Sequence, residues 1–262
     1  MRRFMLFVLL ICLLISCADD VDDNTIVDNT IYSELSLNFD HHVGDDDLVL
    51  SEATYQKNGG ETFQVDTLKY IISNIVLHRP NGDTFKYPVK DSYFLINEEA
   101  PSSLNINLTE IPEGEYDKIS FGFGVDQSNY PLNGVDNFVP TAEENGMLWA
   151  WAAGYKFLKF EGTYSTDSSS ESQNFLYHVG SHGTNLDNYK EIVLNLNQVI
   201  QLEEEVITEI NINMDVLKIF NAVHALNLSD KDDIQVDPEN APKVSENMRA
   251  SFSIDTIIST TE

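Results

Sequence analysis

Residues 35 to 40, Leu35-Ser36-Leu37-Asn38-Phe39-Asp40, alternate apolar and polar side chains. Successive side chains of a β-strand point to opposite faces, so this period of two predicts a strand that buries one face and exposes the other. The same reasoning predicts further strands along the chain. They are expected at residues 63–77, 85–96, 104–108, 116–125, 148–164, 175–179, 192–196, 206–214 and 251–257.

Turn-forming residues separate these expected strands. They stand at residues 58–60, 80–82, 111–114 and 180–183. Helical signals are few, and only Asp215 is placed to cap a short helix that runs to Asn221. The serine-rich residues 165–173 are expected to form an exposed loop. Many short strands with such turns predict an all-β fold, an antiparallel β-sandwich or barrel-like domain with at most one or two short helices.

The N-terminus has the pattern of a secretory signal. Arg2 and Arg3 precede the apolar run 4–15, which is too short to cross a membrane as a helix. The end of this run and the two residues after it read Leu14-Ile15-Ser16-Cys17. They resemble a bacterial lipobox, in which the cysteine becomes the lipid-modified first residue of the mature protein. We therefore expect a lipoprotein signal peptide at 1–16 and a bilayer anchor at Cys17, with an ordinary secretory signal cleaved elsewhere as the alternative.

An acidic polar stretch follows the expected anchor. Residues 17–32 include Asp19, Asp20, Asp22 and Asp23 and offer little to bury, which predicts a flexible tether. The stretch resembles the acidic export signal of surface-exposed bacterial lipoproteins. We expect an outer-membrane lipoprotein, and its position on the periplasmic face or the cell surface stays open. Residues 33–262 are then expected to form a single β domain.

Composition excludes several classes of protein and site. The chain has 43 acidic and 15 basic residues and a formal net charge of −28, a surface that repels nucleic acid. Cys12 lies inside the expected signal, so Cys17 is the only cysteine of the expected mature chain, which leaves no disulfide and no thiolate metal site. No hydrolase, nucleotide-binding or zinc-protease motif is present, so we expect a protein that is not an enzyme.

Both tryptophans of the chain lie in one stretch, Gly146-Met147-Leu148-Trp149-Ala150-Trp151. On a strand, Trp149 and Trp151 share a face. An indole ring is largely apolar but carries an N–H that needs a partner when buried, so such a pair either fills a core or lines a site where apolar and polar surroundings meet.

Two histidines are expected at strand ends beside glycine turns. His41 stands in Phe39-Asp40-His41-His42-Val43-Gly44, and His178 stands in Tyr177-His178-Val179-Gly180-Ser181-His182. Metal ligands are commonly placed in this way, although a single histidine of this kind is more often a surface or rim residue. Neighbouring strand residues face opposite ways, so at most one of His41 and His42 faces a given site. The roles of His42 and His182 stay open.

These segments occur in the same order in one protein family. The chain resembles the MbnP-like domain family from about Leu35 to Phe252. The residues that carry the resemblance are 39–44, 68–75, 114–116, 121–126, 146–151 with 154–155, and 178–180. The tryptophan motif followed by the histidine–glycine motif is its most specific part.

The resemblance implies a secreted β-rich protein that binds one copper ion. It also implies that histidines and a tryptophan oxidised to kynurenine bind the metal, and that a di-haem MbnH-type protein, related to cytochrome c peroxidases, carries out the oxidation. By position, it indicates His41 and His178 as ligands and Trp149 or Trp151 as the modified residue. Imidazole is a ligand that suits copper.

The leading hypothesis is therefore a lipid-anchored copper-binding protein for copper acquisition, storage or delivery. It requires two histidines to converge on one tryptophan. The alternative is a surface binding module without a metal, partnering an outer-membrane receptor, in which the tryptophans form a recognition patch or part of the core.

Overall fold

The protein is described from a computed structural model. The structure describes residues 31–57, 59–126, 138–149, 154–166, 168–182 and 186–261. The expected signal peptide, Cys17 and Trp151 lie outside the described residues, so the predictions made for them stay predictions. Within the described part, no helix combines the length and the apolar character needed to cross a membrane.

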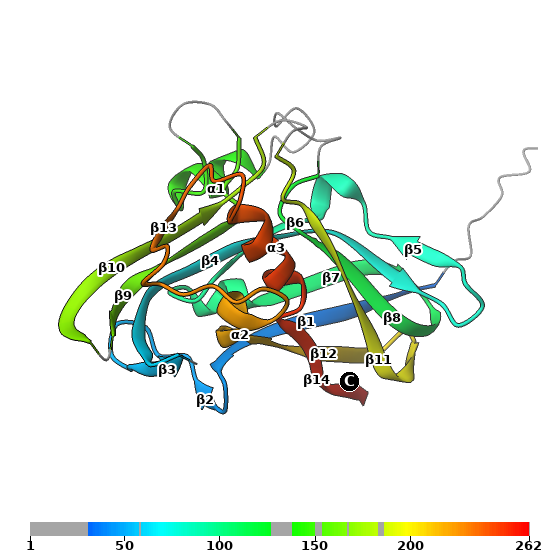
Figure 1. Cartoon of the computed structure of the whole chain (residues 1–262). Helices are drawn as coiled ribbons and strands as arrows, with labels where there is room; N and C mark the ends of the chain where they lie inside the picture. Colours follow the sequence, from blue (N-terminus) through cyan, green and yellow to red (C-terminus); the bar gives the residue numbers. More distant parts are fainter. Residues whose placement is uncertain are drawn as a thin grey trace, which may run out of the picture.

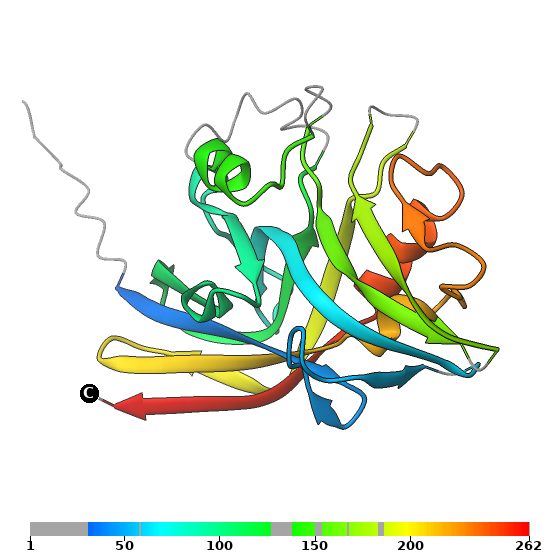
Figure 2. The same ribbon diagram turned by 90° about the vertical axis from the view of Figure 1, so that its left-hand side faces the viewer.

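One sheet lies along the bottom of the view in Figure 2. Its strands are β1 (Tyr32–Val43), β2 (Asp46–Asp47), β7 (Asn105–Pro112), β12 (Val206–Asp215) and β14 (Phe252–Thr261). They follow the order β14-β12-β1-β2, with β7 also paired to β1. The two strands at its centre, β1 and β12, run parallel, whereas the other pairs are antiparallel. This parallel pair departs from the purely antiparallel arrangement that the sequence predicts.

The second sheet is built around the long strand β4 (Glu61–His78), which runs across the molecule in Figure 1. Its order is β11-β8-β4-β9-β10-β13, and β3, β5 and β6 also pair with β4. The bounds are β3 (Tyr55–Lys57), β5 (Thr84–Lys86), β6 (Tyr93–Asn97), β8 (Gly114–Phe123), β9 (Leu158–Thr166), β10 (Ser169–Val179), β11 (Lys190–Leu202) and β13 (Asp233–Ile234).

Helices occupy a small part of the fold. The described residues contain α1 (Val139–Glu144), α2 (Leu217–Asn221) and α3 (Ala241–Arg249), and the 3₁₀ turns η1 (Val89–Asp91) and η2 (Pro101–Leu104). The helix expected after Asp215 is α2, whose first N–H, at Leu217, donates to the Asp215 carboxylate. The sequence locates only α2, so α1 and α3 are both additional; α3 packs against α2 and against strands β8, β10 and β11.

The core fills the space between the two curled sheets. Phe39 of β1 meets Tyr70 of β4 and Phe121 of β8 edge to face, at centroid distances of 6.4 and 6.0 Å. Phe220 of α2 packs on Phe63 and Phe160 at 5.1 and 5.5 Å. Such tilted ring pairs are the arrangement that aromatic quadrupoles favour. The all-β, sandwich or barrel-like class predicted from the sequence is confirmed.

Three predicted segments differ in detail. The expected strand 85–96 is interrupted, because Pro88 cannot donate to a ladder and the chain forms η1 between β5 and β6. The expected loop 165–173 is mostly strand, since β9 continues to Thr166 and β10 begins at Ser169. The expected strand 148–164 begins only at Leu158, and the described residues before it, 148–149 and 154–157, belong to no strand.

Candidate functional site

The two described ends of the tryptophan stretch, residues 147–149 and 154–156, pair with each other and belong to no strand. Leu148 and Tyr155 form an isolated antiparallel bridge, and Trp149 N–H donates to the Gly154 carbonyl at 3.0 Å. Helix α1 supports this pairing, because Met147 N–H donates to the Ala142 carbonyl at 2.7 Å and the rings of Phe138 and Tyr155 lie 5.7 Å apart. The backbone position of Trp149 is therefore set by its pairing with Gly154 and by helix α1.

The side chain of Trp149 is buried, with 4% of its surface exposed, and is surrounded by cationic or imidazole groups. The ring of His178 lies 6.0 Å from the indole at an interplanar angle of 64°, and that of His182 lies 5.3 Å away at 50°. Lys156 Nζ stands 5.2 Å from the indole centroid. These four side chains, Trp149, Lys156, His178 and His182, are called the indole site below.

Gly180 allows the chain after β10 to pass close to the indole. A Cβ atom on Gly180 would lie 2.3 Å from the Tyr155 carbonyl oxygen and 3.1 Å from Trp149 Nε1. The first distance is far inside van der Waals contact, so no larger residue fits without a shift of the backbone. The glycine after β10 thus allows the segment that carries His182 to lie against the same indole.

His178 is positioned by a carboxylate. Its Nε2 lies 2.6 Å from Glu161 Oε1 of the neighbouring strand β9. Burial lowers the pKa of His178, and the hydrogen bond to Glu161 acts in the opposite direction. Because the ionised Glu161 can only accept, the neutral imidazole carries its proton on Nε2 and presents its lone pair at Nδ1.

His182 has a ring nitrogen without a partner. Its Nε2 is buried, and among the described residues nothing hydrogen-bonds to it. Burial also lowers the pKa of His182, which keeps the ring neutral near pH 7. The backbone around it is fixed, since His182 N–H donates to Leu186 and Asn188 Nδ2 donates to the Gly180 carbonyl at 2.8 Å. A buried nitrogen without a hydrogen bond is costly unless something else binds it.

His41 lies elsewhere in the fold. Its Nδ1 is 2.6 Å from Glu98 Oε2 and its Nε2 is 2.8 Å from the Tyr70 hydroxyl, so both ring nitrogens are engaged. The adjacent His42 is half-buried and contacts the Gly44 carbonyl through Nδ1 at 2.6 Å.

The strand register separates His41 from His178. Tyr70 lies opposite Leu158, which lies opposite Val179, so these three side chains share the face that meets β1 and His41. His178, one residue before Val179, projects from the other face. The structure thus brings Trp149 together with His178 and does not bring His41 to them, contrary to the expected convergence.

The described residues contain no group of three or more His, Cys, Asp or Glu side chains arranged to hold a metal. Two of the described histidines, His178 and His182, stand beside the indole. A ligating ring has its centre about 3 Å from the metal, so two rings that share one ion have centres up to about 6 Å apart. The indole centroid lies 6.0 Å from the His178 ring and 5.3 Å from the His182 ring, which is within that limit. One ion could therefore be shared by these rings if the side chain of Trp149 offered a donor atom.

Sequence reasoning missed His182 as a neighbour of Trp149. The signal was present in His178-Val179-Gly180-Ser181-His182, because a glycine between two histidines permits a close approach of neighbouring backbone and side chains. A strict strand alternation would place these two histidines on one face as well, but only the structure shows that both meet the indole.

A family model described as MbnP matches residues 32–240. Among solved structures, MbnP from Methylosinus trichosporium is similar, with 14% sequence identity and a TM-score of 0.47, over 72% of this chain and 78% of that chain. The search of curated proteins found no match.

Proposed function

The chain belongs to the MbnP family, and on that premise we propose that it is a lipid-anchored, periplasmic or cell-surface copper-binding protein. Its role is acquisition, storage or delivery of one copper ion, without catalysis. Copper is the cargo in this proposal. The anchor is Cys17 in the lipid bilayer of the outer membrane.

One observation carries the proposal: a buried indole between two histidines that are kept neutral by burial. A metal ligand must offer a lone pair, and the indole site has one at His178 Nδ1 and one at His182 Nε2. Imidazole nitrogen is a preferred donor for copper. The hydrogen bond from His178 Nε2 to Glu161 is the kind of outer-shell contact that orients a ligating imidazole.

The third donor in the proposal comes from Trp149. An intact indole nitrogen is a poor ligand, because its lone pair belongs to the ring. Ring opening to kynurenine needs an oxidant such as a peroxide, which adds two oxygen atoms as the indole C2–C3 bond breaks. Hydrolysis of the resulting formamide by water then releases one carbon as formate and leaves an aromatic amine that can bind a metal. The partner proposed for this oxidation is a di-haem protein related to cytochrome c peroxidases. Trp151 is the other candidate for the same modification.

His41 has no place in the proposed ligand set. Both of its ring nitrogens already have partners, and it lies across the sheet from the indole. The set is therefore His178, His182 and the modified tryptophan.

The test is purification of the protein from its native host, followed by copper analysis and mass mapping of the peptide across residues 146–156. We expect a copper-to-protein ratio near one and the mass of kynurenine in that peptide. Absence of copper together with unmodified Trp149 and Trp151 would contradict the proposal and favour a binding module without a metal.

Variants locate the site. His178→Gln and His182→Gln are each expected to lower the copper ratio severalfold. His41→Gln and His224→Gln are the matched controls and are expected to retain it, since His224 is paired with Glu246 outside the indole site. Loss of copper only in His41→Gln would place the ion elsewhere and overturn the proposed ligand set.

A further inference from the structure

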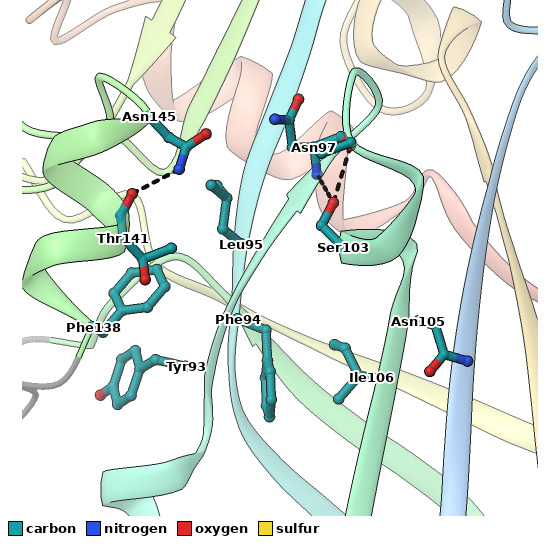
Figure 3. A pocket seen from close by; sticks show the side chains of 11 residues that line it. Tyr93, Phe94, Leu95, Asn97, Ser103, Asn105, Ile106, Phe138, Thr141 and Asn145 are labelled. Carbon is teal, nitrogen blue, oxygen red and sulfur yellow. Dashed lines mark hydrogen bonds between the residues drawn. The ribbon is translucent and has the colours of Figure 1, made fainter.

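A groove of about 350 Å³ runs along the outer edge of β6, and none of the residues that line it belongs to the indole site. Figure 3 shows its two walls, helix α1 on one side and η2 with the start of β7 on the other. Tyr93 extends toward Phe138 of α1, whereas Phe94 lies on the side of Ile106. The volume is at the lower end of the range for ligand-binding pockets, roughly 300–1,000 Å³.

Strand β6 has one paired edge and one unpaired edge. It pairs with residues 69–73 of β4 and with no other strand among those described. Glu98 N–H donates to Leu68 at one end of this pairing, and Asn74 N–H donates to Ser92 at the other. Hydrogen-bonded positions alternate along an antiparallel pair, so the N–H and C=O of Leu95 point away from β4.

Leu95 therefore presents a free donor and a free acceptor along the groove. Its opposite residue, Ile71, directs its own N–H and C=O to Phe157 and Gly124 on the other side of β4. Across the described chain the structure gives the Leu95 backbone no hydrogen-bond partner. A strand edge of this kind is a template for pairing with another extended chain.

The side chains around this edge are uncharged. The apolar ones are Tyr93, Phe94, Leu95, Ala100, Ile106 and Phe138, and the polar ones are Asn97, Ser103, Asn105, Thr141 and Asn145. The two carboxylates that directly follow β6 are paired with cationic or imidazole groups, Glu98 with His41 and Glu99 with Lys69 at 2.7 Å. In a chain with a net charge of −28, an uncharged groove selects against charged ligands.

We propose that this groove binds an extended, uncharged peptide segment that adds as a strand to β6. One peptide residue exchanges two backbone hydrogen bonds with Leu95. Its apolar side chain packs on the Tyr93 and Phe138 side, and the neighbouring side chains face Ile106. Strand addition with side-chain pockets is a common mode of peptide recognition. This function is separate from copper binding and shares no residue with the indole site.

The probe is the capped tripeptide acetyl-Thr-Leu-Thr-amide, titrated into the isotope-labelled protein and followed by NMR. We expect the largest shift at the Leu95 amide and smaller shifts at the side-chain amides of Asn97 and Asn145. The same peptide methylated on the leucine nitrogen cannot donate to Leu95 and is expected to bind at least about tenfold more weakly. Glucose, which has hydroxyl groups but no peptide backbone, is expected to cause no shift.

A pair of variants on one helix provides the control. Thr141→Trp fills the groove from an exposed position and is expected to abolish the peptide-induced shift. Glu143→Trp places the same bulk at an exposed position of α1 outside the groove and is expected to leave binding unchanged. Equal binding of the methylated peptide, equal shifts with glucose, or undiminished binding to Thr141→Trp would each overturn the proposal.

Discussion

The rings of His182 and Trp149 lie 5.3 Å apart, centroid to centroid, in a part of the fold where no regular strand holds either residue. The contact exists because Gly180, directly after the end of β10 at Val179, lets the chain pass close to the indole. Tyr155 contributes the backbone oxygen that limits the space at this turn. The indole site therefore depends on a glycine that has no chemical group of its own.

Gly180→Ala is expected to lower the free energy of unfolding by about 1–3 kcal/mol, the usual cost of an atom forced into a filled space. The added Cβ would meet the Tyr155 carbonyl oxygen at 2.3 Å, so the backbone at Tyr155, and with it the paired Trp149, must shift. Urea unfolding measures the stability, and tryptophan fluorescence reports a more exposed indole. Gly82→Ala is the control, since no atom lies within 4 Å of its Cβ and only backbone strain of about 1 kcal/mol is added. An unchanged emission spectrum in Gly180→Ala would contradict the packing described.

Stability is expected to fall as the pH is lowered from 7.5 to 5.5. Burial lowers the pKa of both His178 and His182, so below the ordinary histidine value of about 6.5 the unfolded chain binds protons that the folded protein does not. The loss begins near that value and ends once the pH passes below the folded pKa of each ring. Urea unfolding at several pH values measures it.

Two variants test this pH dependence. The test protein carries both His178→Gln and His182→Gln, and the control protein carries His224→Gln. The double variant is expected to flatten the dependence between pH 7.5 and 5.5, because the two buried rings are gone. His224 pairs with Glu246 at a half-exposed position, and its replacement is expected to leave the slope in place. A slope that persists in the double variant would assign the effect to other groups.

The fold was largely predictable from the sequence because its strands are half-buried. In β1, Leu35, Leu37 and Phe39 are all buried while Ser36 and Asn38 between them are not, which is the pattern that period-two reasoning detects. Helix α3 was missed because its apolar residues are few. The parallel pairing of β1 with β12 was missed because alternation fixes the face of a residue and not the direction of its partner strand.

The candidate site was predictable only in part. The pairing of Trp149 with His178 was expected, and the structure places them in contact. The expected convergence of His41 and His178 is not found. Both stand near strand ends, but His41 packs against one face of the β4–β9–β10 sheet and His178 projects from the other face. The face from which His178 projects, relative to His41, depends on how β4, β9 and β10 are aligned with one another. That alignment is not encoded locally in a single sequence.

Glu61→Gln is expected to lower the free energy of unfolding by about 3–5 kcal/mol, as for other broken buried ion pairs. Glu61 lies 3.0 Å from Lys57 Nζ, and both side chains are buried. It also accepts from the N–H groups of Leu228 and Ser229, which attach the segment after α2 to β4. Burial acts to raise the pKa of Glu61, but the hydrogen bonds from Ser229, Lys57 and Leu228 outweigh it and lower that pKa.

Lowering the pH is expected to reduce the stability that Glu61 contributes. The stability that Glu61 contributes is present above its unfolded pKa and is lost as the pH falls through the lowered folded value. Glu239→Gln is the control for Glu61→Gln, because its pair with Lys243 is exposed and such pairs contribute about 0–1 kcal/mol. Equal unfolding free energies for the two variants would show that the Lys57–Glu61 pair adds nothing to the fold.

Tyr70→Phe separates the role of His41 from that of the indole site. The Tyr70 hydroxyl is the partner of His41 Nε2, and both side chains are buried, so its removal leaves one buried nitrogen unsatisfied. The expected cost is about 1–3 kcal/mol of unfolding free energy. Because Tyr70 faces β1 and His178 projects from the other side of the sheet, the copper ratio and the tryptophan fluorescence are expected to stay at wild-type values. If Tyr70→Phe kept its stability but lost copper, His41 would belong to the metal site and the ligand set proposed around His182 would be wrong.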